Sequence, residues 1–463
     1  MFLILLTVLW SLEAKLVLVQ AITRHGDRGP LLKIPGLTPY GEIEQLTILG
    51  MKQQISLGKM LRDHYGGSDG IIPQKFNTSL VYARASLFNR TFLSAYSLLN
   101  GLFPNQGTPN NMQVIPIQEE AKQDEYVMRG FDVCQTCNDN YAQYKKSSEY
   151  QQLNQSLTDS FAFVSEKLNY TVNMDNLEHV WDAMFIETIH GNLSEDLIPH
   201  MKKFEEVVEL TRIHYFEGDN NEWAKAANGI SFREFFFDNV EQSPKNNYRF
   251  KLYSGHDSTI LSVMRTLGYD IRVTPYYAAI ILIELHEDEQ ISRSNKKKDP
   301  YRYFRFFYQP DEQSARDGQL WEPFWPVQCG KQNNKKYAIN NNININDDQN
   351  ITKFNCPLET LQKGTKSIIF PHKYELDYFR EKICVQVEYF VPPQKIKYNG
   401  IHPHILYPFM SIFAIISFGS AIIIVMVVFH MIWTRRKRLA QQNVGVNNFV
   451  YEQFAAGTIE EPQ

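Results

Sequence analysis

The sequence predicts an α/β fold with a mostly parallel central sheet that is flanked by helices, an inserted helical cap and one transmembrane helix. Residues 15–30, 78–99 and 248–268 each contain an apolar strand that ends in charged residues. In the second and third of these segments a helical apolar pattern follows. Strands that alternate with helices indicate a mainly parallel sheet, in which ligands bind beyond the carboxyl ends of the strands. We therefore expect the three charged clusters to meet at one edge of one sheet.

The composition is typical of a large folded protein and gives no sign of nucleic-acid binding. The chain has 463 residues, of which 43% are hydrophobic and 21% charged, and its formal net charge is −4. A chain of this length can bury a core in roughly two or three domains. The one basic tract is short and lies near the C-terminus, whereas nucleic-acid-binding proteins carry extended basic surfaces.

Apolar runs at both ends predict a type I single-pass membrane protein. Residues 1–14 resemble a short secretory signal peptide that is cleaved after Ala14, with a first core strand beginning at Met1 as the alternative. Residues 405–433 contain no Asp, Glu, Lys or Arg and exceed the ~20 residues that a transmembrane helix needs. The basic run TRRKR follows at once, as expected on the cytosolic side. Residues 15–403 would form the ectodomain and residues 434–463 a cytosolic tail.

The tail and the ectodomain carry further signs of the secretory route. In the tail, Tyr451 precedes Phe454 by three positions, which resembles an endosomal or lysosomal sorting signal read by an adaptor, although so short a pattern also arises by chance. We therefore expect a lysosomal, endosomal or cell-surface location. We leave the sequon at Asn89 unglycosylated because a glycan there would crowd Arg90. The other ectodomain sequons are expected to carry glycans: Asn77, Asn154, Asn169, Asn192 and Asn350.

The cysteines of the ectodomain would face an oxidising compartment. Cys134 and Cys137 form the motif CQTC, which also occurs in redox and zinc sites. A redox motif is expected beside a thioredoxin-like βαβ unit, and a zinc site needs further ligands at close spacing. Neither is visible, so the pattern favours disulfides.

The middle and the end of the ectodomain have different patterns. Residues 134–240 contain several segments with apolar residues three and four apart, which predict the helical cap. Residues 276–286 and 301–309 read as a pair of strands joined across a basic turn. Residues 331–350 are rich in asparagine and predict a disordered surface insertion.

Four segments carry a resemblance to a known family. Residues 24–30, RHGDRGP, match the Arg-His-Gly-x-Arg-x-Pro signature of the histidine acid phosphatase family, within the phosphoglycerate mutase-like superfamily. YSGHDSTI, at 253–260, is similar to its second signature, a His-Asp pair. Residues 37–65 and 90–99 resemble its first long helix and the segment with its third active-site arginine. The likeness runs from about Lys15 to Cys384 and is closest to the lysosomal and prostatic type with a C-terminal membrane anchor.

The resemblance implies a phosphomonoester hydrolase that works through a covalent phosphohistidine on His25 and needs neither a metal nor another cofactor. A histidine nucleophile divides one difficult displacement into two easier ones, but it must be unprotonated to attack. Arg24 and Arg28 disfavour the imidazolium by like-charge repulsion, and their forked donors suit phosphate oxygens. Asp257 would protonate the departing alcohol. The site then needs a protonated Asp257 beside a neutral His25, which favours an acidic optimum.

The remaining implied ligands are Arg90 and His256, which would complete the phosphate site. The family usually has the sequence RSTD before this arginine, whereas here Leu87 stands in place of the Asp, so Arg84 is a possible substitute for Arg90. Read without the family, Arg24 and Arg28 are solvated charges at a strand end and Asp257 a helix cap. The expected site residues are His25 as nucleophile, Asp257 as proton donor, and Arg24, Arg28, Arg90 and His256 as phosphate ligands.

The family also suggests cysteine pairings and a possible homodimer. Cys137 resembles the cysteine that pairs with one near the end of the ectodomain, here Cys384, and Cys329 would pair with Cys356. Cys134 is then left over. A further family disulfide is missing, because Ile280 stands where one of its cysteines would be.

Two other functions compete with the phosphatase. One is a catalytically weak family member that acts as a cell-surface receptor or adhesion ectodomain. The other is a phosphomutase, which secretion and the His-Asp pair disfavour. No Gly-x4-Gly-Lys-Ser/Thr loop and no Gly-x-Ser-x-Gly elbow occurs in the sequence. The sequence leaves the physiological substrate open.

Overall fold

The computed structural model describes a large part of the ectodomain. It describes residues 14–68, 70–104, 115–216, 228–241, 247–269, 274–289, 291, 300–310, 322–329, 355–369 and 384. The chain divides into two units, Met1–Val387 and Glu388–Gln463, and the described residues belong to the first. The predicted signal peptide before Ala14, the transmembrane helix, the tail with Tyr451, the sequon at Asn350 and the insertion at 331–350 lie outside them. Within the described ranges, each helix is too short or too polar to cross a membrane.

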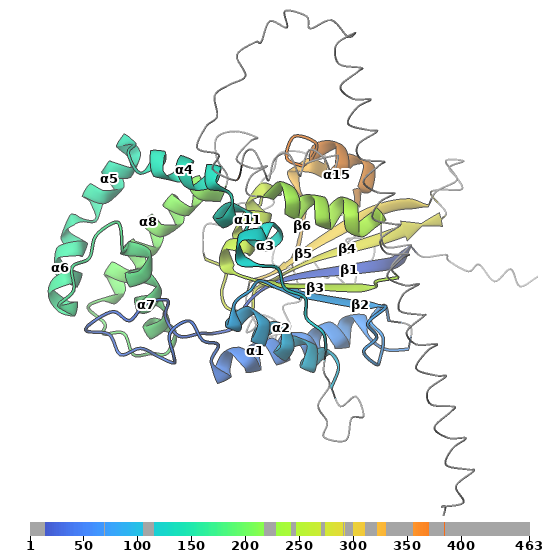
Figure 1. Ribbon diagram of the computed structural model, residues 1–463, viewed down its shortest axis with the longest axis horizontal. Helices are drawn as coiled ribbons and strands as arrows, with labels where there is room; N and C mark the ends of the chain where they lie inside the picture. The colour runs from blue at the N-terminus through green and yellow to red at the C-terminus, as the bar shows by residue number, and fades with distance from the viewer. Residues whose placement is uncertain are drawn as a thin grey trace, which may run out of the picture. The chain divides into compact units, whose positions relative to one another are not determined.

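A seven-stranded mixed sheet forms the centre of the first unit (Figure 1). Its strands are β1 (Lys15–Arg24), β2 (Val81–Ala85), β3 (Phe250–Gly255), β4 (Ile280–Asp288), β5 (Tyr301–Gln309), β6 (Glu322–Phe324) and β7 (Cys356–Pro357). The order is β2-β3-β1-β4-β5-β6, and β7 pairs with β5.

The expectation of a mostly parallel sheet is wrong. Strand β3 runs parallel to β1 and β2, but the pairings of β4 with β1, and of β5 with β4, β6 and β7, are antiparallel. The two strands predicted at 276–286 and 301–309 are the reason. Strand β4 starts with Ile280 opposite Thr23, near the end of β1, and therefore runs antiparallel to β1. Strand β5 then pairs antiparallel with β4. An apolar run predicts a strand but not its direction. The parallel part is limited to the three strands that end in charged clusters.

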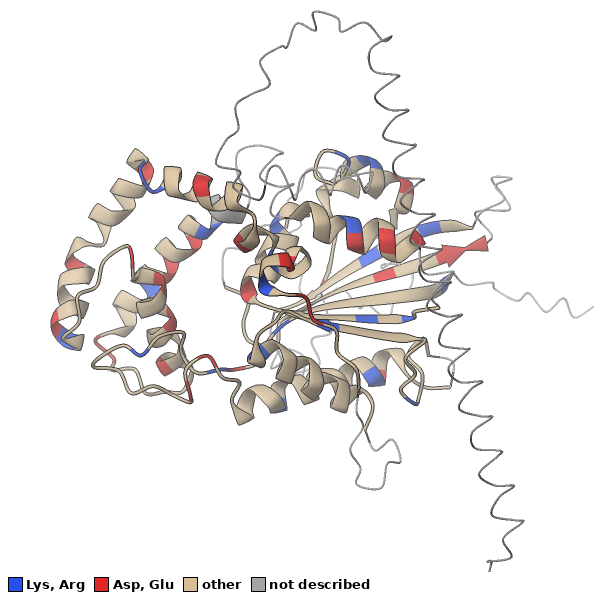
Figure 2. Cartoon of the chain, viewed as in Figure 1, with Lys and Arg blue, Asp and Glu red and all other residues tan. Residues whose placement is uncertain are grey.

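Each face of the sheet is covered by helices, because successive strand residues point to opposite sides. Val19 and Ala21 of β1 pack with helices α1 (Ile48–Tyr65) and α2 (Asn89–Leu102). Leu18 and Ile22 pack on the other side, with α3 (Tyr126–Val133), α11 (Asp257–Thr266) and α15 (Leu358–Gly364). Figure 1 shows α1 and α2 below the strands and α11 above them. Charged residues lie on the strands as well as on the helices (Figure 2), among them Glu287 and Asp288 at the end of β4.

Helices α1 and α2 approach each other closely at two glycines. A Cβ atom on Gly58 would lie 2.0 Å from the carbonyl oxygen of Leu98, and one on Gly101 would lie 2.1 Å from that of Ile55. Only a residue without a side chain fits at these contacts.

The predicted helical cap has its own core. It contains α4 (Gln135–Tyr144), α5 (Ser148–Ser156), α6 (Thr158–Leu168), α7 (Leu177–Ile189) and α8 (Ile198–Phe216). Val164, Trp181 and Phe204 are buried together there with Ile34, which follows β1 in the chain. The segment 228–241, which includes the π-helical turn η2 (Glu234–Asp238), packs instead against the sheet, where Phe235 and Phe236 join the core of β1. Short 3-10 turns, η1 (Lys122–Asp124) and η3 (Val327–Cys329), complete the described elements.

One predicted cysteine pairing is confirmed and the other is wrong. Cys329 is bonded to Cys356 as expected. Cys384, however, is bonded to Cys134 and not to Cys137, whose thiol is free and buried. Cys134 is the residue that precedes α4, and its Cα lies 4.2 Å from that of Cys384, whereas Cys137 lies inside the first turn of that helix.

Candidate active site

The parallel pairing of β1, β2 and β3 brings the three charged clusters to one edge of the sheet. Arg24 is in register with Gly255, and Ala85 with Ser254. The backbone continues this pairing beyond the strands, because the amide of His25 donates to the carbonyl of Gly255 at 3.0 Å. The clusters therefore meet where ligands bind in such sheets, as the strand pattern predicts.

His25 lies in this edge as a buried neutral imidazole. Its Nδ1 is 2.8 Å from the carbonyl oxygen of Gly26. A carbonyl oxygen only accepts, so Nδ1 carries the proton and Nε2 keeps its lone pair. Burial lowers the pKa of His25 well below its usual value, and the positive charges of Arg90, Arg24 and Arg28 lower it further. The neutral form of the His25 ring, with a lone pair on Nε2, is therefore strongly favoured.

The two arginines of the RHGDRGP segment are held by different partners. Arg24 donates to the carbonyl of Pro275, and its guanidinium carbon lies 4.3 Å from the centre of the Tyr277 ring. Arg28 forms two hydrogen bonds, of 2.7 and 3.0 Å, with the carboxylate of Asp182 in α7. The cap thus fixes the orientation of one phosphate-ligand candidate.

Arg90, and not Arg84, lies among these groups. After burial, Arg90 has the strongest effect of any charge on the pKa of His25. Arg84 is instead bound to the buried carboxylate of Glu125, at 2.9 and 3.1 Å. Arg90 forms an ion pair with Glu44, to which it donates a hydrogen bond of 3.0 Å. This carboxylate is present although Leu87 stands where the family has an aspartate. Burial and the nearby Arg28 lower the pKa of Arg90 to about 10, so it remains charged at acidic and neutral pH.

His256 faces His25 across the edge of the sheet. The two rings are nearly perpendicular, with their centroids 5.6 Å apart. His256 Nε2 lies 2.9 Å from the hydroxyl oxygen of Ser86. Burial lowers the pKa of His256 well below its usual value, and Arg90 and Arg129 add to the effect. Both histidines are therefore neutral in the absence of a ligand.

Asp257 begins α11, and its carboxyl group lies near two arginines. Its Oδ2 lies 3.5 Å from a guanidinium nitrogen of Arg24 and 3.5 Å from one of Arg212 in α8. Burial alone would raise the pKa of this carboxyl, but the two arginines hold it far below its usual range. Protonation of Asp257, which the predicted role as proton donor requires, therefore has to overcome the charges of Arg24 and of Arg212, a residue of the cap.

Several buried donors in the site have no hydrogen-bond partner among the described residues. They are the Nε atoms of Arg24, Arg28 and Arg90 and the hydroxyl of Tyr277. An unpaired buried donor is costly, and such groups are normally satisfied. These four donors lie beside the His25 imidazole, and an oxyanion bound there would accept hydrogen bonds from them.

The functional residues that sequence reasoning missed come from the cap and from loops. They are Glu44, Asp182, Arg212 and Tyr277. Asp182 had a weak signal, because it is one acidic residue inside the apolar run VWDAMF. For Arg212 the sequence gives no signal that separates it from the solvated charges of the same helix.

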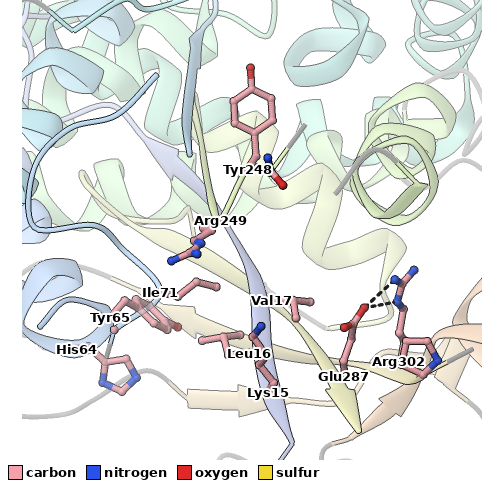
Figure 3. Close-up of a pocket in the computed structure, with 13 residues that line it drawn as sticks. Lys15, Leu16, Val17, His64, Tyr65, Ile71, Tyr248, Arg249, Glu287 and Arg302 are labelled. Atoms are coloured by element: carbon pink, nitrogen blue, oxygen red, sulfur yellow. Dashed lines mark hydrogen bonds and ion pairs between the residues drawn. The ribbon is translucent and has the colours of Figure 1, made fainter. Parts of the chain in front are cut away.

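A separate cavity of about 670 Å³ lies where β1 begins, at the opposite end of the strand from His25 (Figure 3). Lys15, Tyr65, Arg249 and the ion pair of Arg302 with Glu287 are among its lining residues. It shares no residue with the candidate site. Among the described residues, no three His, Cys, Asp or Glu side chains are grouped so that they could hold a metal ion.

Comparisons with known proteins give relatives for most of the described chain. The histidine phosphatase superfamily (branch 2) matches residues 34–309. The chain is 30% identical over 282 residues to a putative acid phosphatase 5 of Caenorhabditis elegans, a match that covers 58% of this chain and 65% of that protein. It is 26% identical over 314 residues to the lysosomal acid phosphatase of Rattus norvegicus, with coverages of 61% and 72%. The chain therefore spans about two thirds of the length of these relatives.

Solved structures resemble the chain in fold. The phytase of Klebsiella sp. ASR1 has a TM-score of 0.55 and 14% identity, over 77% of this chain and 96% of that one. The apo form of the Hafnia alvei phytase has a TM-score of 0.53 and 15% identity, over 77% and 98%. At these identities the likeness concerns the fold alone.

Proposed function

Because the chain belongs to the histidine phosphatase superfamily (branch 2), we propose that it hydrolyses phosphate monoesters through a phosphohistidine formed on His25. One observation carries this proposal: the buried imidazole of His25, protonated on Nδ1, lies near three arginines, and each arginine has an Nε donor without a partner among the described residues. The named acid phosphatases among the relatives support the same class of enzyme.

In the first step, the phosphoryl group binds to the arginines and His256. Nε2 of His25 attacks phosphorus, the bond between phosphorus and the ester oxygen breaks, and the alcohol leaves. The Nδ1–H group keeps its hydrogen bond to the carbonyl oxygen of Gly26. This hydrogen bond stabilises the positive charge that phosphorylation places on the ring. The arginines stabilise the charge that develops on the phosphoryl oxygens.

Asp257 supplies the proton to the leaving oxygen. It is ionised in the ligand-free site, but a bound phosphate offsets the charges that keep it so, and the carboxyl then takes up a proton in acidic solution. In the second step the carboxylate accepts a proton from water, the water oxygen attacks phosphorus, and the bond to Nε2 breaks. Inorganic phosphate, neutral His25 and protonated Asp257 result, and the carboxyl releases its proton when phosphate leaves and the positive charges of the arginines are no longer offset.

The finer features of this function belong to the same proposal. The enzyme works without a metal, because the arginines take over the charge stabilisation that metal ions give elsewhere. It is anchored by residues 405–433 with its catalytic domain in the lysosome or outside the cell. The likeness to a lysosomal acid phosphatase supports the lysosomal location.

The test is hydrolysis of p-nitrophenyl phosphate by the full chain in detergent at pH 5 and pH 8. We expect activity that is higher at pH 5, survives EDTA and is inhibited by vanadate. His25→Ala should abolish it, while the control His179→Ala, an exposed histidine of the cap, should retain it. Turnover by a folded His25→Ala protein, or a folded wild-type chain without activity, would refute the proposal.

A further inference from the structure

Tyr277 lies in the centre of the candidate site although nothing in the mechanism above uses it. It precedes β4, and the amide of the next residue, Ala278, donates to the carbonyl of His25 at 3.1 Å. The Tyr277 ring lies under the guanidinium of Arg24, and its centroid is 5.8 Å from that of the His25 ring. The segment is therefore tied to the nucleophile by its backbone as well as by its ring.

The hydroxyl of Tyr277 is buried, and among the residues that the structure describes it has no hydrogen-bond partner. The side chain is only 3% exposed. Two other buried tyrosines differ in this respect, because Tyr65, at the end of α1, donates to Glu284 at 2.7 Å and Tyr253, in β3, donates to Glu234 at 2.7 Å. Buried tyrosine hydroxyls usually have such a partner. Without a partner the hydroxyl costs stability in the ligand-free protein, and a ligand that accepts a hydrogen bond in the site would remove this cost.

The charges around this hydroxyl fit an anion as its partner. Burial raises the pKa of Tyr277 to about 12, although the positive charges of Arg28 and Arg24 act in the opposite direction. The hydroxyl is therefore protonated throughout the acidic and neutral range and can donate. After burial, the charges with the strongest effect on the pKa of Tyr277 are Arg28 and Arg24, and the carboxylates of Asp182 and Asp27 have weaker effects. The Nε donors of both arginines also have no partner among the described residues.

We propose that the hydroxyl of Tyr277 is a further phosphate-binding group, which donates a hydrogen bond to an oxygen of the phosphoryl group on its way to and from His25. The inference rests on the proposed function for the identity of the ligand. It assigns to Tyr277 the role of an oxyanion donor that works beside the arginines, and it explains why the protein retains a polar atom that the ligand-free fold leaves unsatisfied.

The test compares Tyr277→Phe with Tyr276→Phe in the full chain. Both changes remove one oxygen, but Tyr276 is 45% exposed and serves as the matched control. We expect Tyr277→Phe to lower kcat/KM for p-nitrophenyl phosphate by about 10- to 100-fold, as for a hydrogen bond to a charged group. The melting temperature without ligand should stay the same or rise, because the unsatisfied hydroxyl is gone. Tyr276→Phe should change neither quantity.

A second measurement separates this inference from the function on which it rests. Vanadate or inorganic phosphate should raise the melting temperature of the wild-type chain more than that of Tyr277→Phe, whether or not the chain turns over substrate. Wild-type activity together with an unchanged ligand-induced shift in Tyr277→Phe would overturn the inference and leave the phosphatase intact. A loss of melting temperature in Tyr277→Phe would also overturn it, because the hydroxyl would then have a structural role.

Discussion

The imidazole rings of His25 and His256 lie edge to face, with their centroids 5.6 Å apart. They reach this position because each directly follows one of two adjacent parallel strands, β1 and β3. Both are buried, and both have a pKa well below the usual value through burial and nearby arginines. Two neutral imidazoles at this distance have consequences for stability as well as for chemistry.

The first prediction concerns acid sensitivity. An unfolded histidine has a pKa near 6.5, and the pKa of His256 in the folded protein is lower. As the pH falls, the folded chain therefore binds fewer protons than the unfolded chain does. Stability is therefore lost below the unfolded pKa, and a histidine that stays neutral at pH 5 costs about 2 kcal/mol. His256→Gln, which cannot titrate, should lose about that much less stability than the wild type between pH 7 and pH 5.

The measurement is urea unfolding of the full chain at both pH values. The control is His179→Gln, because the side chain of His179 is exposed, and its pH dependence should equal that of the wild type. An equal loss of stability in His256→Gln and wild type would mean that the buried imidazole is protonated in the folded protein.

The second prediction concerns Arg212, which reaches from the cap to the proton donor. Asp257 is held as an anion by Arg24 and Arg212, with smaller effects of His25 and Arg28. Removing one positive charge should raise the pKa of Asp257, because an opposite charge at this range lowers a carboxyl pKa by roughly 1–3 units. The pH profile of kcat reports the groups of the substrate complex, in which Asp257 is protonated, so in Arg212→Gln its alkaline limb should move up by about 1 pH unit.

A comparison of two substrates shows whether this shift in the pH profile comes from the protonation of Asp257. An alkyl phosphate leaves as a strong base and needs the proton, so its profile should shift most. The p-nitrophenolate group leaves readily, so its profile should shift less. Arg212→Lys keeps the charge and should keep the wild-type profile. Identical profiles for Arg212→Gln and the wild type with both substrates would show that Arg212 does not act on Asp257.

Whether a site residue can be predicted from the sequence depends on the element that brings it to the site. His25 and His256 could be placed together in advance, because both follow apolar strands and parallel strands end at one edge. The direction of β4 could not be predicted, because an apolar run indicates a strand but not whether that strand runs parallel or antiparallel to its neighbour. Arg212 and Asp182 could not either, because helical periodicity identifies a buried stripe but not which charged residue near it points toward another domain.

The cysteines illustrate the same limit at a smaller scale. Cys134 and Cys137 are three residues apart, so the sequence pattern accommodates either as the partner of Cys384. The start of α4 decides between them, because it leaves Cys134 outside the helix and buries Cys137 inside its first turn.

The third prediction concerns the ion pair that links the cap to the signature segment. Asp182 accepts two hydrogen bonds from Arg28 and one, at 2.9 Å, from the amide of Leu31. Asp182→Ala would leave the buried Arg28 without its partner, and breaking such a pair costs about 3–5 kcal/mol. We expect that loss in urea unfolding, together with a higher KM, because the freed guanidinium is no longer aligned. Asp175→Ala, at an exposed position in the loop before α7, should stay within about 0.5 kcal/mol of the wild type.

This prediction has a clear contrary outcome. Should Asp182→Ala unfold at the wild-type urea concentration, Arg28 would have to be solvated in solution, and the cap would not contribute to the orientation of the phosphate site.

The fourth prediction tests the corrected disulfide. Cys134 and Cys384 are 250 residues apart in sequence, so their bond closes a very long loop in the unfolded chain. Cross-links over long loops restrict the unfolded state most, and removing a native disulfide typically costs about 2–5 kcal/mol. Cys134→Ser should therefore lose stability in this range. Cys137→Ser removes no bond and should lose less, about 1–3 kcal/mol, from placing a hydroxyl in a buried site.

Chemical mapping distinguishes the two pairings directly. After unfolding without reductant, alkylation of the wild-type chain should label Cys137 and leave Cys134 and Cys384 in one linked peptide pair. Burial raises the pKa of the Cys137 thiol to about 12, so it should resist labelling while the chain is folded. A linked pair of Cys137 with Cys384 would restore the pairing that the family resemblance suggested. Cys134→Ser would then be the milder change, because Cys134 would contribute only a buried thiol.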